Sequence, residues 1–525
     1  GELVDSNDHG RCCNCKQGSE FFVDPTSSLV DHRIVLLLLP AHHLINSLHA
    51  NDHLLVRPTL PTSPKILVLR TPFRQHDDNT SYRNPNMTTS YFRSSILHFH
   101  SDPDIDGDKA YTFAADGILT VDEQGKVVGV EEDAATFLES LSDQSSVTDY
   151  SGYLIIPGMI DTHIHFPQVE IIASFGEQLL DWLNNYTFPC EGQYKDPVYA
   201  KERADFFLQE LLRNGTTTAL VFASVHKESA QAFFEASAAR NTRMICGKVM
   251  MDRNAPDFLC DTPQSSYDDS KALIEEWHEK GRQLYAVTPR FAITSTAEQL
   301  ELAGKLVEEY PTVYMQTHIS ENVKEVAFVK ELFPERLDYL DVYDHYNLLG
   351  PRSVFAHGIH LTAREHQRFR ETRSSVSFCP TSNLFLGSGL LKIDELEREQ
   401  VIYSVATDVG GGTSMSMLQT LNEAYKVNQL NGKALSPLKS LYLATLGNAQ
   451  SLQLQDKIGN FAPGREADFV VLDFNGTPLM KMRHTKCKTL NEKLFSMIIM
   501  GDDRAVKATY VMGKLAHDRD TTAEE

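Results

Sequence analysis

The chain has 525 residues, 42% of them hydrophobic, enough for a substantial core in one large and one smaller domain. Its formal net charge of −22, with Lys and Arg spread along the chain, opposes binding to nucleic acid or to an anionic membrane surface. The longest aliphatic run, residues 34–39, is far shorter than the ~20 residues that cross a bilayer. These features predict a globular protein with neither a nucleic-acid nor a membrane partner.

Residues 1–86 are rich in Asn, Asp, Ser, Pro and His and lack sustained periodicity, so we expect a poorly ordered extension. Within it, Cys12, Cys13 and Cys15 either belong to a flexible tail or form a small metal site with His9. Eight cysteines in a chain of this size are too few for a disulfide scaffold. We therefore expect a reducing, cytoplasmic setting.

Two flanking regions have the pattern of small antiparallel sheets. Residues 109–157 contain short alternating strands separated by Asp-Gly and Gln-Gly turn signals. The same pattern of short alternating strands occurs again in 464–474 and 504–518. We therefore expect both ends of the chain to build one small β-sandwich domain.

Between the flanks, short apolar strands alternate with helical stretches, which indicates βα units and a parallel sheet. The segments Ser295-Thr296-Ala297-Glu298 and Thr362-Ala363-Arg364-Glu365 both have the pattern of capping boxes just after a strand. Eight βα units in about 280 residues favour an α/β fold of the (β/α)8, TIM-like barrel type. The predicted strands are 154–160, 216–223, 243–251, 284–292, 312–318, 353–358, 375–380 and 401–408.

The predicted organisation follows from these patterns. In chain order it is an extension (1–86), the first part of the β domain (87–156), the catalytic barrel (157–456), the second part of the β domain (457–516) and a tail (517–525).

Polar side chains at the C-terminal ends of barrel strands are the candidates for chemistry, because active sites of such barrels lie there. The first strand leads into DTHIHFPQ, in which His163 and His165 are two residues apart. Residues i and i+2 of a strand face the same side, so both imidazoles point into the barrel mouth. The other strand ends contribute Arg290, His318, Glu321, His357, Ser382, Asn383 and Asp408.

The His-x-His spacing alone does not identify a metal ligand. His98 and His100 have the same spacing without a barrel strand around them. What distinguishes the pair at the barrel mouth is that three further strands bring His318, His357 and Asp408 to the same rim. Mixed nitrogen and oxygen ligands suit zinc or iron and leave a position open for water.

The sequence favours one metal ion. Barrel hydrolases with two metals often use a carboxylated lysine on strand four, and 284–292 contains no lysine. Lys248, on strand three, is the alternative carbamate site, but a structural role is favoured. Cys379 is predicted to lie in the core and not to act as a nucleophile.

Several segments together resemble a known family. PGMIDTHIHFPQ, THISE, FAHGIH, CPTSNLFLGSG and TDVGGGTSMSML resemble, in this order, the signature segments of the amidohydrolase superfamily and, within it, of the guanine deaminases. The resemblance covers roughly residues 110–515 and includes the more family-specific tract 175–189.

The resemblance implies hydrolytic deamination of guanine to xanthine and ammonia. Glu321, His357 and Asp408 would transfer protons. One zinc ion per subunit is implied, with Fe²⁺ as the alternative. Its ligands would be His163, His165, His318 and Asp408.

Recognition of the purine is implied for a further set of side chains. Arg290 offers a fork of donors suited to a purine carbonyl oxygen, Gln168 offers both a donor and an acceptor, and Phe291 offers an apolar face. Alternatively, Arg290 pairs with a rim carboxylate and Phe291 belongs to the core. The substrate would also contact His165, His318 and Asp408.

Other functions stay open at this stage. The same metal chemistry serves deaminases of 8-oxoguanine, cytosine or adenosine-like substrates and triazine hydrolases. A non-enzymatic scaffold that keeps the barrel is the alternative of another class. By resemblance we expect a homodimer.

Overall fold

The computed structural model describes residues 89–142, 144, 146–175 and 178–521, which lie within one compact unit. The predicted extension 1–86, with its cysteine cluster, lies outside the described residues.

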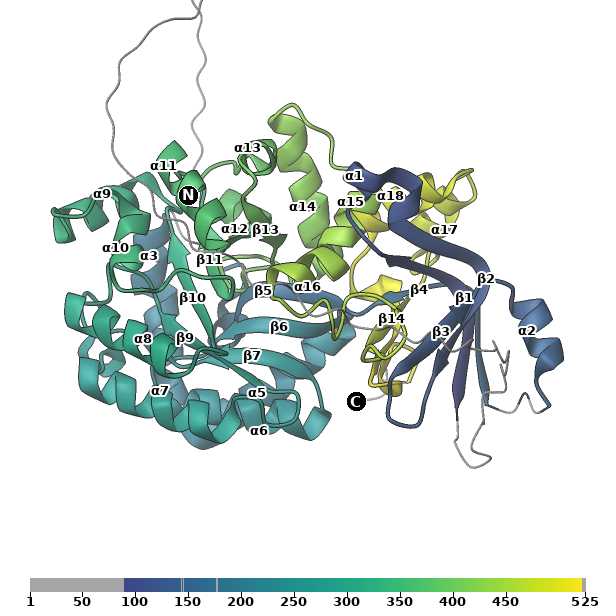
Figure 1. Cartoon of the computed structure of the whole chain (residues 1–525), viewed down its shortest axis with the longest axis horizontal. Helices are drawn as coiled ribbons and strands as arrows, with labels where there is room; N and C mark the ends of the chain where they lie inside the picture. Colours follow the sequence, from purple (N-terminus) through teal and green to yellow (C-terminus); the bar gives the residue numbers. More distant parts are fainter. Residues whose placement is uncertain (1–88, 143, 145, 176–177, 522–525) are drawn as a thin grey trace, which may run out of the picture. The chain divides into compact units, whose positions relative to one another are not determined.

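The predicted parallel barrel is confirmed (Figure 1). Neighbouring strands pair in parallel in the order β5-β6-β7-β9-β10-β11-β12-β13, and a short strand, β8, pairs with β9. The strands are β5 (Met159–His165), β6 (Thr216–Phe222), β7 (Arg243–Gly247), β8 (Val249–Met250), β9 (Leu284–Pro289), β10 (Tyr314–Ile319), β11 (Ser353–His357), β12 (Ser375–Phe378) and β13 (Ile402–Val405).

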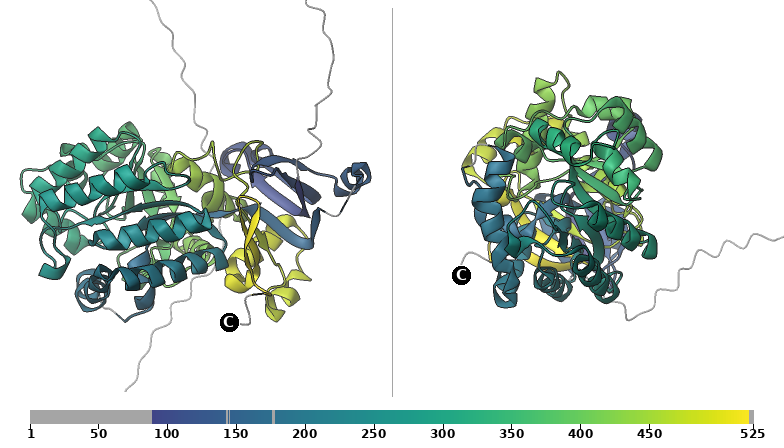
Figure 2. Two further views of the ribbon diagram at one scale, coloured as in Figure 1. Left: turned by 90° about the horizontal axis from the view of Figure 1, so that it is seen from below. Right: turned by 90° about the vertical axis from the view of Figure 1, so that its left-hand side faces the viewer.

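Helices follow the strands and cover the outside of the barrel, where the teal helices of Figure 2 (left) form one layer. This is the arrangement that alternating βα units produce. The main helices are α5 (Pro197–Arg213), α6 (Lys227–Arg240), α7 (Pro263–Trp277), α8 (Ala297–Glu309), α9 (Val323–Leu332), α10 (Tyr339–His345), α11 (Ala363–Thr372), α12 (Pro380–Phe385), α13 (Ile393–Arg398) and α14 (Met417–Leu430).

The capping prediction holds for one helix and is wrong by one residue for another. Thr362 and Glu365 form the predicted capping box of α11. In α8, however, Thr296 and not Ser295 is the N-cap, and its side chain accepts from the backbone N–H of Gln299. Both hydroxyl residues fit the cap pattern, so the sequence alone could not separate them.

The first predicted strand, 154–160, spans two strands of different sheets. β4 (Val147–Pro157) ends in the small sheet, and β5 begins one residue after Gly158. A Cβ at Gly158 would lie 2.1 Å from Oγ1 of Thr217, so only glycine fits this junction. The uniform apolar run conceals the boundary because both halves are buried, each in a different sheet.

The first and last barrel strands, β5 and β13, are joined by a buried side chain. Nδ2 of Asn448 donates to the carbonyl oxygens of Ile160 (2.7 Å) and Val405 (2.8 Å). Its Oδ1 accepts from the backbone N–H of Val405 at 3.0 Å. One amide thus supplies hydrogen bonds to both strands at the seam.

Both flanks build one separate small β domain, as predicted, but its strands form a single mixed sheet and not the two layers of a sandwich. Its order is β16-β15-β14-β4-β1-β2-β3; β1 and β4 are parallel and the other neighbours antiparallel. The Phe92 ring lies 4.9 Å from that of Phe469 and 5.0 Å from that of Tyr510, so this single sheet curls around its own core. The other strands are β1 (Ser90–Phe99), β2 (Tyr111–Val121), β3 (Val127–Glu131), β14 (Phe469–Leu472), β15 (Val506–Val511) and β16 (Lys514–Asp518).

A buried ionic cluster fastens the C-terminal flank to the N-terminal ends of the barrel strands. Glu466 accepts hydrogen bonds from Arg243, which begins β7, and from Arg282, which precedes β9. Arg282 also binds Asp468. Burial raises the pKa of Glu466, but the two guanidinium groups outweigh it and lower this pKa to about 2.

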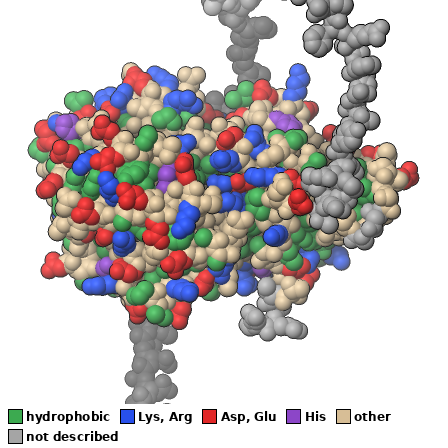
Figure 3. Space-filling view, turned by 60° about the horizontal axis from the view of Figure 1, so that its bottom comes forward, with side chains coloured by type: hydrophobic (Ala, Val, Ile, Leu, Met, Phe, Trp, Pro, Cys, Tyr) green, Lys and Arg blue, Asp and Glu red, His purple; other side chains and the backbone are tan. Residues whose placement is uncertain are grey.

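Among the described residues, no helix is both long and apolar enough to cross a membrane. Acidic and basic side chains are intermixed over the face shown in Figure 3.

Candidate metal centre and active site

A pocket with about 400 Å³ of empty space, the open solvent at its mouth included, lies at the C-terminal ends of the barrel strands. Its polar wall includes predicted residues from five different strand ends or following loops, and Leu179, Trp182 and Leu183 form an apolar side. The polar lining comprises His165, Gln168, Arg290, His318, Glu321, His357 and Asp408.

The His163–His165 pair ends strand β5, and its backbone is held by the last strand. The carbonyl of His163 accepts from the N–H of Asp408 at 2.9 Å, and the N–H of His165 donates to Val409 at 2.8 Å. Behind the pair, buried Asp161 accepts from the backbone N–H of His163 (3.2 Å) and of Thr407 (3.1 Å). The backbone of the His163–His165 pair is therefore fixed by the same contacts that close the barrel.

Three imidazoles converge. Nε2 of His165 lies 3.3 Å from Nε2 of His163 and 3.2 Å from Nε2 of His318. Nδ1 of His318 donates to the carbonyl oxygen of Arg290 at 2.7 Å. Nε2 of His318 therefore carries a free lone pair, which points at the other rings. Burial lowers the pKa of His165 and of His318 well below the ordinary value, which keeps both rings in the neutral form that binds metals.

Asp408 completes the group. Its Oδ1 lies 3.1 Å from Nε2 of His163 and 3.5 Å from Nε2 of His165. Burial raises the pKa of Asp408, but His163 and its other histidine neighbours outweigh this effect and lower it. The candidate ligand atoms of His163, His165, His318 and Asp408 all lie within 4.8 Å of one another. Several lone pairs facing one point fit a divalent cation of the zinc or iron type.

Glu321 and His357 stand beside this group, as predicted. Oε2 of Glu321 lies 3.4 Å from Nε2 of His357, and Ser388 donates to its other oxygen at 3.0 Å. Burial raises the pKa of Glu321 to about 7, against the lowering effect of His357. Asn383 Oδ1 accepts from Nδ1 of His357 at 2.9 Å and fixes its tautomer.

Two of these side chains are carried by strained backbone. His357 has φ +73° and Asp408 has φ +52°, the left-handed region that side chains other than glycine rarely adopt. Such strain persists only where the surrounding structure enforces it, and it gathers at functional sites. Ser382 is buried nearby, and its Oγ has no hydrogen-bond partner within the described part of the chain.

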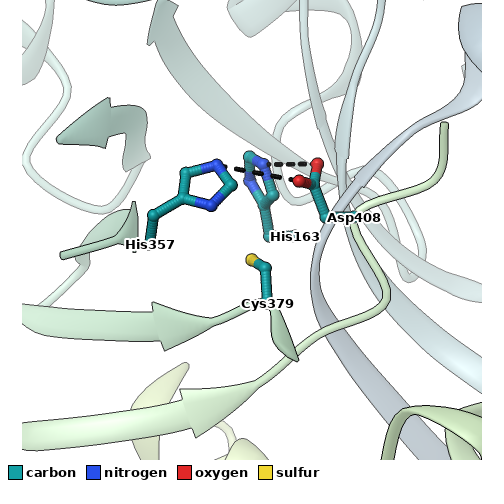
Figure 4. Close-up of side chains that lie close together, drawn as sticks. All are labelled: His163, His357, Cys379 and Asp408. Carbon is teal, nitrogen blue, oxygen red and sulfur yellow. Dashed lines mark ion pairs between the residues drawn. The ribbon is translucent and has the colours of Figure 1, made fainter. Parts of the chain in front are cut away.

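Cys379 belongs to a second buried group of possible metal ligands, with His163, His357 and Asp408, whose ligand atoms lie within 4.8 Å of one another (Figure 4). Asp408 faces both His163 and His357, and the thiol lies next to these rings. Burial raises the pKa of the Cys379 thiol well above its ordinary value, and Sγ donates to the carbonyl of Ser377 at 3.4 Å. This environment disfavours the thiolate that a nucleophile or ligand requires.

Lys248, the alternative carbamate site, has another partner. Its ammonium group is buried, pairs with Asp261 and donates to the carbonyl of Val249 at 3.1 Å. The structural role favoured by the sequence agrees with this geometry.

Gln168 and Arg290, two of the side chains predicted to bind the purine, share a buried acid, Glu191, that was not among the predicted residues. Glu191 accepts from NH1 of Arg290 at 3.0 Å and from Nε2 of Gln168 at 2.8 Å. Arg290 thus lines the cavity and pairs with a carboxylate at once. Phe291 also lines the cavity, with its ring 6.3 Å from that of His318. Glu191 lies in a short helix, α4 (Phe188–Glu191), in the long connection between β5 and β6 and not directly at a strand end, so inspection of strand ends could not find it.

The sequence pattern of the amidohydrolase family matches residues 154–516. The chain belongs to the amidohydrolase family. It is 53% identical to the guanine deaminase of Escherichia coli (strain K12) over 412 residues, which cover 78% of this chain and 93% of that relative. The resemblance stated from the sequence motifs is therefore confirmed.

Solved structures of amidohydrolases agree with the fold. Escherichia coli guanine deaminase superimposes with a TM-score of 0.79 at 50% identity, covering 82% of this chain and 99% of the other. Guanine deaminase from C. acetobutylicum, with guanine bound in its active site, gives a TM-score of 0.72 at 29% identity, covering 82% and 100%.

Proposed function

We propose that this amidohydrolase deaminates guanine: water and guanine give xanthine and ammonia. The observation that carries the proposal is one cavity in which a metal-binding His/His/His/Asp group, a buried carboxylic acid and an arginine–glutamine wall meet. The likeness to guanine deaminases supports the choice of substrate.

His163, His165, His318 and Asp408 would hold one metal ion, for which we propose zinc, with Fe²⁺ as the alternative. Such an ion, when bound, lowers the pKa of water to about 7 and thereby supplies a nucleophile at neutral pH.

Glu321 is the proposed proton carrier. Its carboxylate accepts the proton of the attacking water and passes it to a ring nitrogen of guanine as the water oxygen adds to C2. The C2–N bond to the amino group then breaks, and the nitrogen leaves as ammonia after taking up the second proton of the water, from the hydroxyl group now on C2, which becomes the carbonyl of xanthine. Nε2 of His357 lies 3.7 Å from Oδ2 of Asp408, and these two groups orient the water and guide that second proton.

Substrate recognition is assigned to the opposite wall. Arg290 donates to the carbonyl oxygen of the purine, Gln168 pairs with its ring edge, and Phe291 packs against it. A purine seated in this way would also contact His165, His318 and Asp408.

The direct test is ammonia release from a panel of free bases, combined with metal analysis of the purified protein. We expect turnover of guanine and about one zinc ion per chain. Turnover of cytosine, 8-oxoguanine, an adenosine-like base or a triazine in place of guanine would reject the substrate assignment. Absence of turnover with all of them, in a metal-loaded protein, would favour a scaffold.

The proposal includes a homodimer in the cytoplasm. Cys190, Cys246, Cys260, Cys379 and Cys487 are free, as a reducing compartment requires. Light scattering of the purified chain should give the mass of two subunits.

A further inference from the structure

Glu191 is a fully buried carboxylate that lies directly behind two side chains of the cavity wall. Its exposed fraction is 0%, so it contacts no solvent. Both of its oxygens, at 3.0 Å each, accept from NH1 of Arg290, and Oε1 also accepts from Nε2 of Gln168 at 2.8 Å. It therefore touches both side chains that we propose to read the purine, without lining the cavity itself.

The contacts of Gln168 permit only one orientation of its amide. Its Oε1 accepts from the backbone N–H of Gly410 at 3.1 Å, while its Nε2 donates to Glu191. A flipped amide would set two N–H groups against each other at Gly410 and two oxygens against each other at Glu191. Because an ionised carboxylate only accepts, Glu191 fixes which edge of Gln168 is a donor.

Glu191 also balances the charge of Arg290. The guanidinium is buried, with an exposed fraction of 3%, and it lies in the same cavity as the proposed metal ligands. A buried cation beside a metal site requires a nearby anion. Among the described residues, the side-chain hydrogen bonds of Arg290 all come from NH1, so NH2 remains for a ligand.

We infer that Glu191 is a positioning residue that sets the specificity of this cavity for 6-oxopurines, by holding Arg290 and Gln168 in one donor–acceptor pattern. The inference rests on the proposed function. An amino group at the purine 6-position would bring donors against the donors of Arg290, and an unsubstituted 6-position would offer it no acceptor.

The test is Glu191→Gln, which keeps the volume of the side chain but adds a donor that competes with Nε2 of Gln168. Two non-reacting bases are used as competitive inhibitors of guanine turnover: hypoxanthine, which has the 6-oxo group, and purine, which lacks it. We expect the inhibition constant of hypoxanthine to rise at least tenfold and that of purine to change less than twofold. The kcat/KM for guanine should fall at least tenfold.

Glu466→Gln is the matched control. It neutralises another buried carboxylate paired with an arginine flanking β9, at the opposite end of the barrel. It should lower the thermal midpoint and leave both inhibition constants within twofold. Glu191→Asp, which keeps the charge, should restore part of the preference for hypoxanthine and provides a second variant if Glu191→Gln folds poorly.

Equal changes in both inhibition constants, or no change in either, would overturn the inference. A wild-type chain that turns over another base but not guanine would instead reject the proposed function, so the two failures are distinct.

Discussion

The chain contains two His-x-His pairs at strand ends, and their surroundings differ: β5 ends at His165, whereas β1 ends at Phe99, one residue before His100. The rings of His163 and His165 are 4.9 Å apart, and those of His98 and His100 are 4.8 Å apart. At the barrel mouth a third histidine and Asp408 complete a buried group. On β1, by contrast, His98 accepts from the backbone N–H of Phe461 at 3.5 Å, and His100 is exposed beside Thr112.

The spacing therefore determines that two rings share a face, and the neighbouring strands determine what the rings do. A barrel brings several strand ends to one rim, so a pair of rings gains further ligands there. Strand β1 lies between β2 and β4 in the small sheet; His98, within the strand, is buried, whereas His100 lies one residue past its end and is exposed.

The same substitution in each pair should show the largest difference between them. His163→Asn removes a proposed ligand, and we expect kcat/KM to fall by more than about 10⁴-fold with loss of bound metal. His98→Asn should leave kcat/KM and the metal content within twofold of the wild-type values. Steady-state assays and metal analysis of the two variants decide it; a metal-loaded, active His163→Asn would remove His163 from the ligand set.

A second variant separates metal binding from proton transfer within the barrel site. Glu321→Gln keeps the size of the side chain but cannot accept the proton of water. We expect metal content to stay unchanged and kcat to fall by about 10²–10⁴-fold. A near-normal rate would exclude Glu321 as the proton carrier.

The smallest effect concerns stability at the pair in the small sheet. Burial, aided by His100, lowers the pKa of His98 to about 4. The unfolded chain takes up this proton near pH 6.5 and the folded chain only near pH 4, so stability declines as the pH falls between these values. From pH 7 to pH 5 the loss assigned to His98 is about 2 kcal/mol.

His98→Asn measures this contribution, because asparagine can accept from Phe461 but does not titrate. Denaturant unfolding at pH 7 and pH 5 should show a smaller loss of stability for the variant than for the wild type. Equal losses would mean that His98 does not carry this pH dependence.

The fold was largely predictable because its strands are apolar and regularly spaced. The exceptions share a cause: local patterns do not record which sheet a buried residue joins. The run 154–160 is uniformly apolar although Gly158 divides it between two sheets. The seam formed by Asn448 likewise depends on packing between distant segments.

The candidate site was predictable where chemistry follows a strand directly, as for His163, His318, His357 and Asp408. Glu191 lies outside that rule because helix α4 brings it to the wall from the loop after β5. A usable signal was an acidic residue within an otherwise apolar turn, in Phe188-Pro-Cys-Glu191. Such a residue, once buried, needs a cationic partner.

The Arg243–Glu466 contact has a consequence for synthesis on the ribosome. Its partners are 223 positions apart in the sequence. At about 5–20 residues per second, translation needs roughly 10–45 s to cover that distance. During this interval the nascent chain already contains His163 and His165, while Arg243 and, once synthesised, Arg282 lack the carboxylates of Glu466 and Asp468. The N-terminal ends of the barrel strands therefore stay without this ionic cluster until the segment that contains Glu466 has been synthesised.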